Sequence, residues 1–266
     1  MVFRFVLFAI LIAVPAPLAP SWAQRNTPLV ERPDQARRYN ECMAQARSDP
    51  LRALPTAEKW VAEGGGMGAR HCVATAMYQT GRYAQAAAQF EAIARDMGGE
   101  RPGLRAELWA QAGLAWLDSG AVDKAVQAQT RAVELKPGDA EVWLDRGLAY
   151  SAARDWRRAI ADFDRAQQLR PSDVEILILR AAAWRNAGDP AKALADAQRA
   201  LGIAPDHSEA LLERGFALLA RGDRPAATND FNRVLKLVPP GSNAAHRADA
   251  GLRGELPKPP AAPPKP

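Results

Sequence analysis

Hydrophobic and polar positions follow a pattern that repeats every 34 residues along most of the chain. Within each block, apolar side chains recur three and four residues apart, which predicts amphipathic helices. In the block 140–173, this spacing predicts one helix over 140–153 and a second over 156–169. Asp139 is placed as the N-cap of the first helix, and Pro171 follows where the second must already have ended. Each block is therefore expected to fold as a helical hairpin.

Five columns of residues keep the 34-residue step in register. They are Pro137, Pro171, Pro205 and Pro239; Gly113, Gly147, Ala181 and Gly215; Trp109, Trp143, Leu177 and Leu211; Ala125, Ala159, Ala193 and Ala227; and Trp116, Tyr150, Trp184 and Leu218. The blocks begin near residues 106, 140, 174 and 208. Because most of the tryptophans fall in these columns, we interpret them as packing residues and not as a ligand platform.

These blocks resemble the tetratricopeptide repeat, whose signature is W-x2-L-G-x2-Y, then A-x3-F, then P. In one block the resemblance is carried by Trp143, Gly147, Tyr150, Ala159, Phe163 and Pro171. The chain departs from the signature where the family has Leu, since it has Arg146, Arg180 and Arg214 there. The resemblance implies an all-α fold, a right-handed superhelical solenoid of stacked helix-turn-helix hairpins whose first helices line a concave groove.

The resemblance is strong over 106–239 and weaker back to about residue 34. In the first hairpin, Pro50 and Pro55 fit a second helix poorly. The expected organisation is a secretory signal peptide at 1–23, a degenerate N-terminal hairpin at 34–66, a divergent repeat at 67–105, repeats at 106–139, 140–173, 174–207 and 208–241, a C-terminal capping helix at 242–254 and a Pro-rich disordered tail at 255–266. A polyproline ligand for an aromatic groove is the alternative interpretation of the tail.

The first 23 residues have the pattern of a secretory signal. Arg4 supplies the positive charge, residues 5–14 form the apolar core, and Ser21 and Ala23 are the small residues before a cut ahead of Gln24. The apolar run is shorter than the roughly 20 residues that a membrane-spanning helix needs. The sequence therefore predicts a periplasmic or secreted protein without an integral membrane span after cleavage. A signal retained as an anchor is the alternative.

Export changes the interpretation of the two cysteines, because cysteine pairs tend to oxidise outside the cytosol. Cys42 and Cys72 lie on two different predicted helices, and their spacing is not that of a zinc site. We expect a disulfide that joins the first two hairpins. Two buried thiols are the alternative.

Two charged columns are present or absent together. Arg146, Arg180 and Arg214 form one column, and Asp162, Asp196 and Asp230 form the other, sixteen residues later. The block at 106 has Ala112 and Ala128 at these positions and lacks both charges. Because an unpaired buried charge is costly, each Arg is predicted to form a structural ion pair with its own or a neighbouring Asp.

The resemblance also implies which residues face the groove and bind a partner. They are Tyr78, Gln111, Leu114, Leu117, Leu144, Asp145, Leu148, Ile178, Leu179, Arg185, Asn186, Leu212, Phe216 and Leu219. This stripe is more apolar than a solvated surface needs to be. Either another chain packs on it, or the tail or a neighbouring repeat covers part of it.

A ladder of glutamates marks the start of each first helix. Its members are Glu107, Glu141, Glu175 and Glu209. Each carboxylate is placed where it favours the positive end of its helix. An acidic rim that receives a basic ligand is the alternative interpretation.

Composition adds little evidence for catalysis or for nucleic acid. The 266 residues are 48% hydrophobic and 24% charged, and the net charge is only +5. His71, His207 and His246 share no spacing, and the chain has none of the common catalytic or phosphate-binding motifs. We therefore assign no catalytic, cofactor-binding or metal-binding residue, no cofactor and no nucleic acid partner.

The sequence favours a non-catalytic protein–protein interaction scaffold of the bacterial cell envelope. It is expected to bind a peptide or a helix of an envelope protein in the concave groove. One alternative is a homo-oligomerising structural subunit that uses the apolar groove. A cell-wall-associated enzyme or a sugar-binding accessory subunit is a less favoured alternative.

Overall fold

The computed structural model describes residues 33–99 and 101–257. The expected signal at 1–23, with its cut after Ala23, lies outside the described residues, as do residues 258–266 of the Pro-rich tail. Within the described ranges the chain forms α-helices and turns and contains no strand. It divides after Ala149 into two compact units. Each unit is described by itself.

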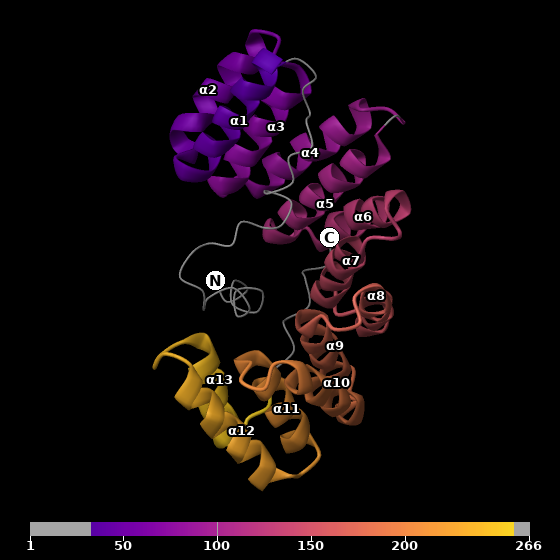
Figure 1. Ribbon diagram of the computed structural model, residues 1–266, viewed down its shortest axis with the longest axis vertical. Coiled ribbons are helices and arrows are strands. Elements are labelled where there is room, and N and C mark those ends of the chain that lie inside the picture. The colour runs from indigo at the N-terminus through magenta and orange to yellow at the C-terminus, as the bar shows by residue number, and fades with distance from the viewer. Residues whose placement is uncertain (1–32, 100, 258–266) are drawn as a thin grey trace. The chain divides into compact units, whose positions relative to one another are not determined.

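The first unit holds seven of the described helices (Figure 1). They are α1 (Pro33–Ser48), α2 (Pro50–Ala62), α3 (Gly66–Gln79), α4 (Tyr83–Asp96), α5 (Pro102–Asp118), α6 (Val122–Leu135) and α7 (Ala140–Ala152), the last of which crosses the boundary by three residues. Consecutive helices pack on one another, so that α5 lies against both α4 and α6.

The second unit holds the remaining six described helices. They are α8 (Trp156–Leu169), α9 (Val174–Asn186), α10 (Pro190–Ile203), α11 (Ser208–Ala220), α12 (Arg224–Leu237) and α13 (Asn243–Leu252). Here too each helix packs on the next, and α10 lies against α9 and α11. The prediction of an all-α helical repeat solenoid is confirmed. We call the odd-numbered helices α1–α11 the A helices, and the even-numbered helices the B helices.

The helix boundaries follow from local signals in the sequence. The side chain of Asp155 accepts a hydrogen bond from the amide of Arg158, and that of Asp189 from the amide of Lys192, so these residues cap α8 and α10. Ser242 caps α13 by accepting a hydrogen bond from the amide of Ala245. Caps of this kind satisfy amides that the first turn of a helix leaves without partners.

Helix α2 differs from the expectation that its prolines would fit a helix poorly. Pro50 occupies the first turn, where a helix needs no amide hydrogen, and Asp49 caps the helix with a hydrogen bond from the amide of Arg52. Pro55 lies inside the helix and is exposed. Proline is tolerated there because solvent can reach the backbone carbonyl that the missing amide leaves unbonded.

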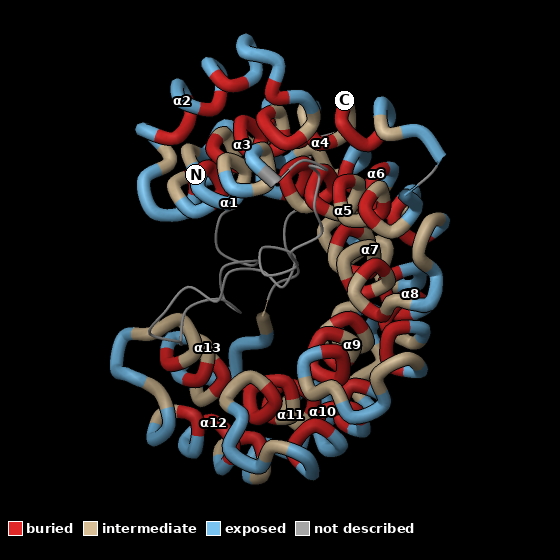
Figure 2. Tube along the Cα trace, turned by 45° about the horizontal axis from the view of Figure 1, so that its top comes forward, coloured by how far each residue is buried: buried red, intermediate tan, exposed pale blue. Residues whose placement is uncertain are grey.

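Small residues let the A and B helices approach closely. A β-carbon at Gly215 on α11 would lie 2.6 Å from Cε1 of Phe231 on α12. Phe231 in turn packs against Phe216, with ring centroids 5.0 Å apart. Figure 2 shows how buried and exposed residues alternate along these helices. The core of this unit is therefore a seam between stacked helices.

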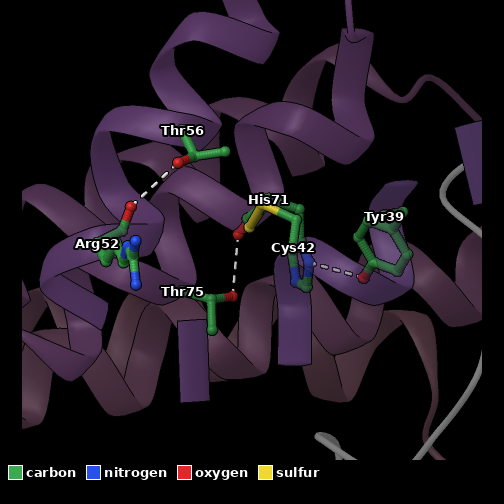
Figure 3. The surroundings of a disulfide bond; sticks show 7 residues. Tyr39, Cys42, Arg52, Thr56, His71 and Thr75 are labelled. Carbon is green, nitrogen blue, oxygen red and sulfur yellow. Dashed lines mark hydrogen bonds between the residues drawn. A yellow bond between two sulfur atoms is a disulfide. The ribbon is translucent and has the colours of Figure 1, made fainter. Parts of the chain in front are cut away.

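A disulfide between Cys42 and Cys72 joins α1 to α3 (Figure 3). Both cysteines are buried, together with Trp60 of α2 and Met43. The bond thus ties the first hairpin to the second at the point where the 34-residue pattern is weakest.

The turns that follow α3, α5, α9 and α11 each contain a glycine with positive φ. These glycines are Gly81, Gly120, Gly188 and Gly222. The equivalent residue between α7 and α8 is Arg154, whose φ is 60°, and no other described residue besides glycine has a positive φ. The left-handed conformation is unfavourable for a residue with a β-carbon.

We therefore expect Arg154→Gly to raise the free energy of unfolding by about 1 kcal/mol. The measurement is chemical denaturation followed by circular dichroism. The matched control is Gly188→Arg, where φ is 85° and a side chain would be strained. The explanation is wrong if Arg154→Gly lowers stability or if Gly188→Arg leaves it unchanged.

Candidate functional site

The structure divides the fourteen residues predicted to line the groove into two groups. Seven are buried, namely Gln111, Leu117, Leu144, Ile178, Leu179, Leu212 and Phe216. Seven remain partly exposed, namely Tyr78, Leu114, Asp145, Leu148, Arg185, Asn186 and Leu219. The second group can contact a partner, whereas the first cannot do so in this structure.

The assignment of the buried residues to a ligand-facing surface is corrected by their packing. Ile178, Leu212 and Phe216 belong to one apolar cluster formed by α9 to α13. Phe216 is only 1% exposed, and the guanidinium groups of Arg185 and Arg247 each lie 5.8 Å from its ring centroid. Of the explanations left open by the sequence, coverage by neighbouring helices accounts for these side chains.

In the first unit, the set of exposed and partly exposed residues of α3, α5 and α7 named next is what we call the α3–α7 surface. Its residues are Tyr78, Leu114, Asp118, Asp145 and Leu148. The Tyr78 hydroxyl donates a hydrogen bond to Oδ2 of Asp118 at 2.5 Å, which links α3 to α5. Burial raises the pKa of the Asp118 carboxyl, and the hydrogen bond from Tyr78 opposes this shift in part. The surface combines aliphatic side chains with carboxylates.

In the second unit, the partly exposed Arg185 belongs to a charged network on the A helices. Its Nε donates a hydrogen bond to Oε2 of Glu213 at 2.8 Å, and NH2 of Arg247 on α13 donates to Oε1 of Glu213 at 2.9 Å. Burial by itself raises the pKa of Glu213, but the two arginine charges outweigh it, so the pKa lies below its usual value. The network fastens α13 to α9 and α11.

This network also changes the interpretation of the glutamate ladder at its last member. Glu209 is not an open acidic rim, because its carboxylate accepts a hydrogen bond from NH1 of Arg247 and its side chain is 15% exposed. The repeat pattern does not indicate this partner, since Arg247 lies beyond the last repeat and no 34-residue column includes it. The only signal available was a basic residue in the capping helix.

The predicted Arg–Asp pairs of the last two repeats are present in the second unit. Arg180 binds Asp196 through Nε at 2.7 Å and through NH2 at 2.5 Å, and it also bonds Asp164 at 2.7 Å. Arg214 binds Asp230 in the same two-pronged way, at 2.8 and 2.6 Å. Both aspartates are buried. Each pair joins an A helix to its B helix.

The pair of Arg146 with Asp162 stays a prediction, because these residues belong to different units. Within its own unit, the guanidinium of Arg146 lies 4.9 Å from the centroid of the Trp143 ring. Asp162 is 4% exposed.

The second aromatic column packs against cations of the following B helix. Nζ of Lys124 lies 4.3 Å from the Trp116 ring centroid, and Nζ of Lys192 lies 4.1 Å from that of Trp184. The indole nitrogen of Trp116 also donates a hydrogen bond to Glu91 at 2.7 Å. These contacts give the aromatic rings a structural role within the hairpins.

A buried polar chain crosses three A helices of the first unit beside the disulfide. Nε2 of His71 lies 2.9 Å from Oε1 of Gln111, and because that oxygen can only accept, Nε2 carries the proton. Nδ1 of the neutral ring then accepts a hydrogen bond from the Tyr39 hydroxyl at 2.9 Å (Figure 3). Burial lowers the pKa of His71 to about 4. The predicted groove residue Gln111 thus has an internal partner.

The described residues contain no group of three His, Cys, Asp or Glu side chains that could hold a metal ion. Among the same residues, every helix is too short or too polar to cross a membrane.

Removal of the arginine from a pair whose carboxylate is buried should be more destabilising than removal of both partners. Arg214→Met leaves the Asp230 carboxylate buried without its cation, and we expect a loss of about 3 kcal/mol in unfolding free energy. The double variant Arg214→Met/Asp230→Leu should recover part of that loss. Arg233→Met, which removes an exposed arginine of α12, serves as the control and should cost less than about 1 kcal/mol. Equal losses in the single and double variants would contradict the pairing.

The first unit should lose stability in acid because of His71. In the unfolded chain His71 has a pKa near 6.5, and in the folded chain it is about 4. The unfolded state therefore binds more protons between these values, so the unfolding free energy falls as pH drops through this window, by up to about 3 kcal/mol. In His71→Gln the loss over this window should be smaller. Thermal melts from pH 7 to 4 test this, and equal slopes in both proteins would refute it.

Comparison with known proteins agrees with this architecture. A model of the tetratricopeptide repeat matches residues 74–140 and 144–208. None of the curated proteins compared with the chain matches it.

Solved structures share the fold at low sequence identity. A crystal structure of MamA is 19% identical, with a TM-score of 0.55, and the alignment covers 62% of this chain and 94% of that one. MamA from Desulfovibrio magneticus RS-1 is 18% identical, with a TM-score of 0.58, and the alignment covers 64% of this chain and 94% of that one. TTC0263, a thermophilic TPR protein of Thermus thermophilus, is 18% identical, with a TM-score of 0.55, and the alignment covers 71% of this chain and all of that one. At this identity the likeness shows the fold alone. Together with the match to the repeat model and the helix pairs described above, it shows that the chain belongs to the tetratricopeptide repeat family.

Proposed function

We propose that the protein is an exported scaffold of the bacterial cell envelope that binds a segment of another protein on the α3–α7 surface. Tetratricopeptide repeats are protein-interaction scaffolds, and this supports a binding role without turnover. The α3–α7 surface supports the place of binding, because it keeps aliphatic side chains accessible that the packing of the unit does not fully cover.

The chemistry of this surface indicates the kind of segment that would bind. Leu114 and Leu148 offer aliphatic contacts, while Asp118 and Asp145 carry carboxylates on the same A helices. A helix or an extended peptide with apolar side chains and at least one basic group would complement them. The observation that carries the proposal is the partial exposure of Leu114 and Leu148, whereas Phe216, the equivalent residue of α11, is buried.

The proposed export has two lines of support. The pattern of residues 1–23 is that of a secretory signal. The Cys42–Cys72 disulfide is of the kind that persists in oxidising compartments. Mass spectrometry of the protein from a periplasmic fraction should find a chain that begins at Gln24. An intact chain in the cytosolic fraction with both thiols free would contradict export.

Binding is tested by affinity capture from envelope extract with wild-type protein and the variant Leu114→Asp/Leu148→Asp. The variant should lose specific partners, since it places carboxylates where apolar side chains would dock. The matched control is Ala88→Asp, a change at an exposed position of the B helix α4 in the same unit. If every captured protein is retained by both variants, the α3–α7 surface is not the binding site.

Self-association through the same surface is the second candidate function. Light scattering on the purified protein separates the two. A dimer at low micromolar concentration that Leu114→Asp/Leu148→Asp dissociates would favour a structural subunit. A monomer that retains its captured partners favours the scaffold.

A further inference from the structure

The B helices of the second unit expose a strongly basic surface. Their exposed charged side chains include Arg157, Arg158, Arg165, Lys192, Arg199, Arg224, Arg233 and Lys236, which we call the basic B surface. These residues lie on α8, α10 and α12, each on the stripe opposite the buried side chains that contact the A helices. Eight cations therefore share the outward side of one layer of helices.

The buried ion pairs create this surface by drawing carboxylates inward. The aspartates of the three helices at the predicted ion-pair positions, Asp162, Asp196 and Asp230, are each at most 5% exposed. The one other acidic residue within these helices, Asp164, is bonded to Arg180. The repeat thus keeps the positive charges of its B helices outside and holds most of their negative charges inside.

Local partners leave much of this positive charge uncompensated. Arg158 and Lys192 each bind the capping aspartate of their own helix, NH1 of Arg199 lies 3.8 Å from Oδ1 of Asp196, and Arg233 binds Asp206. By contrast, Arg165 bonds the amide oxygen of Gln168, and Arg224 bonds the backbone carbonyl of Leu252. Neutral acceptors such as these do not cancel the charge of a guanidinium.

The first unit provides an internal comparison. Its B helices α2, α4 and α6 carry basic and acidic residues in equal numbers, namely Arg52, Lys59, Arg95, Lys124 and Arg131 against Glu58, Glu91, Asp96, Asp123 and Glu134. The basic excess is therefore a property of the second unit and not of B helices in general.

Two exposed aliphatic side chains accompany the cations. Ile203 at the end of α10 is 49% exposed and Leu237 at the end of α12 is 43% exposed. Each follows an arginine of the basic B surface by four residues, which is one helical turn: Ile203 follows Arg199, and Leu237 follows Arg233. Cations beside accessible aliphatic side chains are typical of surfaces that bind the headgroup region of a membrane.

We propose that the basic B surface binds the anionic headgroups of a phospholipid membrane. The cations are long side chains spread over three helices, which suits a fluid layer of phosphates better than the fixed carboxylates of one protein partner. Attraction of this kind weakens with salt and adds up over the basic residues near the lipid. This inference does not depend on the α3–α7 surface or on what binds there.

Vesicle sedimentation with the full chain tests the proposal. One set of vesicles contains phosphatidylcholine alone, and the other contains phosphatidylglycerol as well. Any insertion of the apolar run at 5–14 is common to both, so the measured quantity is the ratio of the two affinities. We expect wild-type protein to prefer the anionic vesicles at low salt and to lose this preference at high salt.

The variant Arg165→Glu/Arg199→Glu/Arg233→Glu should reduce the preference at least tenfold, since each cation near the lipid contributes about 1 kcal/mol. The control Arg52→Glu/Lys59→Glu/Arg131→Glu changes the net charge equally on exposed B-helix positions of the first unit, and it should retain most of the preference. Circular dichroism verifies that both variants fold. The proposal is overturned if wild type binds the two vesicles equally, or if the control loses as much as the test variant. Binding to soluble polyanions without binding to anionic vesicles would also overturn it.

Discussion

The close packing of each A helix on its B helix is the constraint on which the other features of this protein depend. A single hairpin has no core of its own and buries its apolar stripe only against its partner and its neighbours. Gly215 removes the β-carbon that would block Phe231, and the Arg214–Asp230 pair neutralises the charges that this approach buries.

The same packing decides which side chains are left for binding. In the second unit, Leu212 and Phe216 fill the seam between A helices and are removed from solvent. In the first unit, Leu114 and Leu148 stay partly exposed. The ion pairs act on the other side of the hairpins, because they turn Asp196 and Asp230 inward and leave the arginines of α8, α10 and α12 outside. The packing of A helices on B helices thus determines which residues remain accessible on the α3–α7 surface and on the basic B surface.

The periodic part of the structure could be predicted from the sequence because local rules specify it. The 34-residue step, the prolines and the capping aspartates locate α7 to α12, and the paired columns identify Arg180 with Asp196. Features outside the period could not be found in this way. Arg247 lies in the capping helix, so no column connects it to Glu213. Helix α2 tolerates Pro55 because of its exposure, which the sequence does not reveal.

The groove residues show a different limit. Position within a repeat gives the direction of a side chain, but burial depends on what its neighbours place over it. Leu148 and Phe216 occupy the same position of the repeat, and only Phe216 lies in the cluster that α13 completes.

Hydroxyl-radical footprinting read by mass spectrometry tests this division of the A-helix residues most directly. The account predicts modification of Leu114 and Leu148 in the isolated protein, protection of both when a partner is bound, and protection of Leu212 and Phe216 throughout. Modification of Leu212 and Phe216 to the same extent as Leu148 in the isolated protein would contradict it.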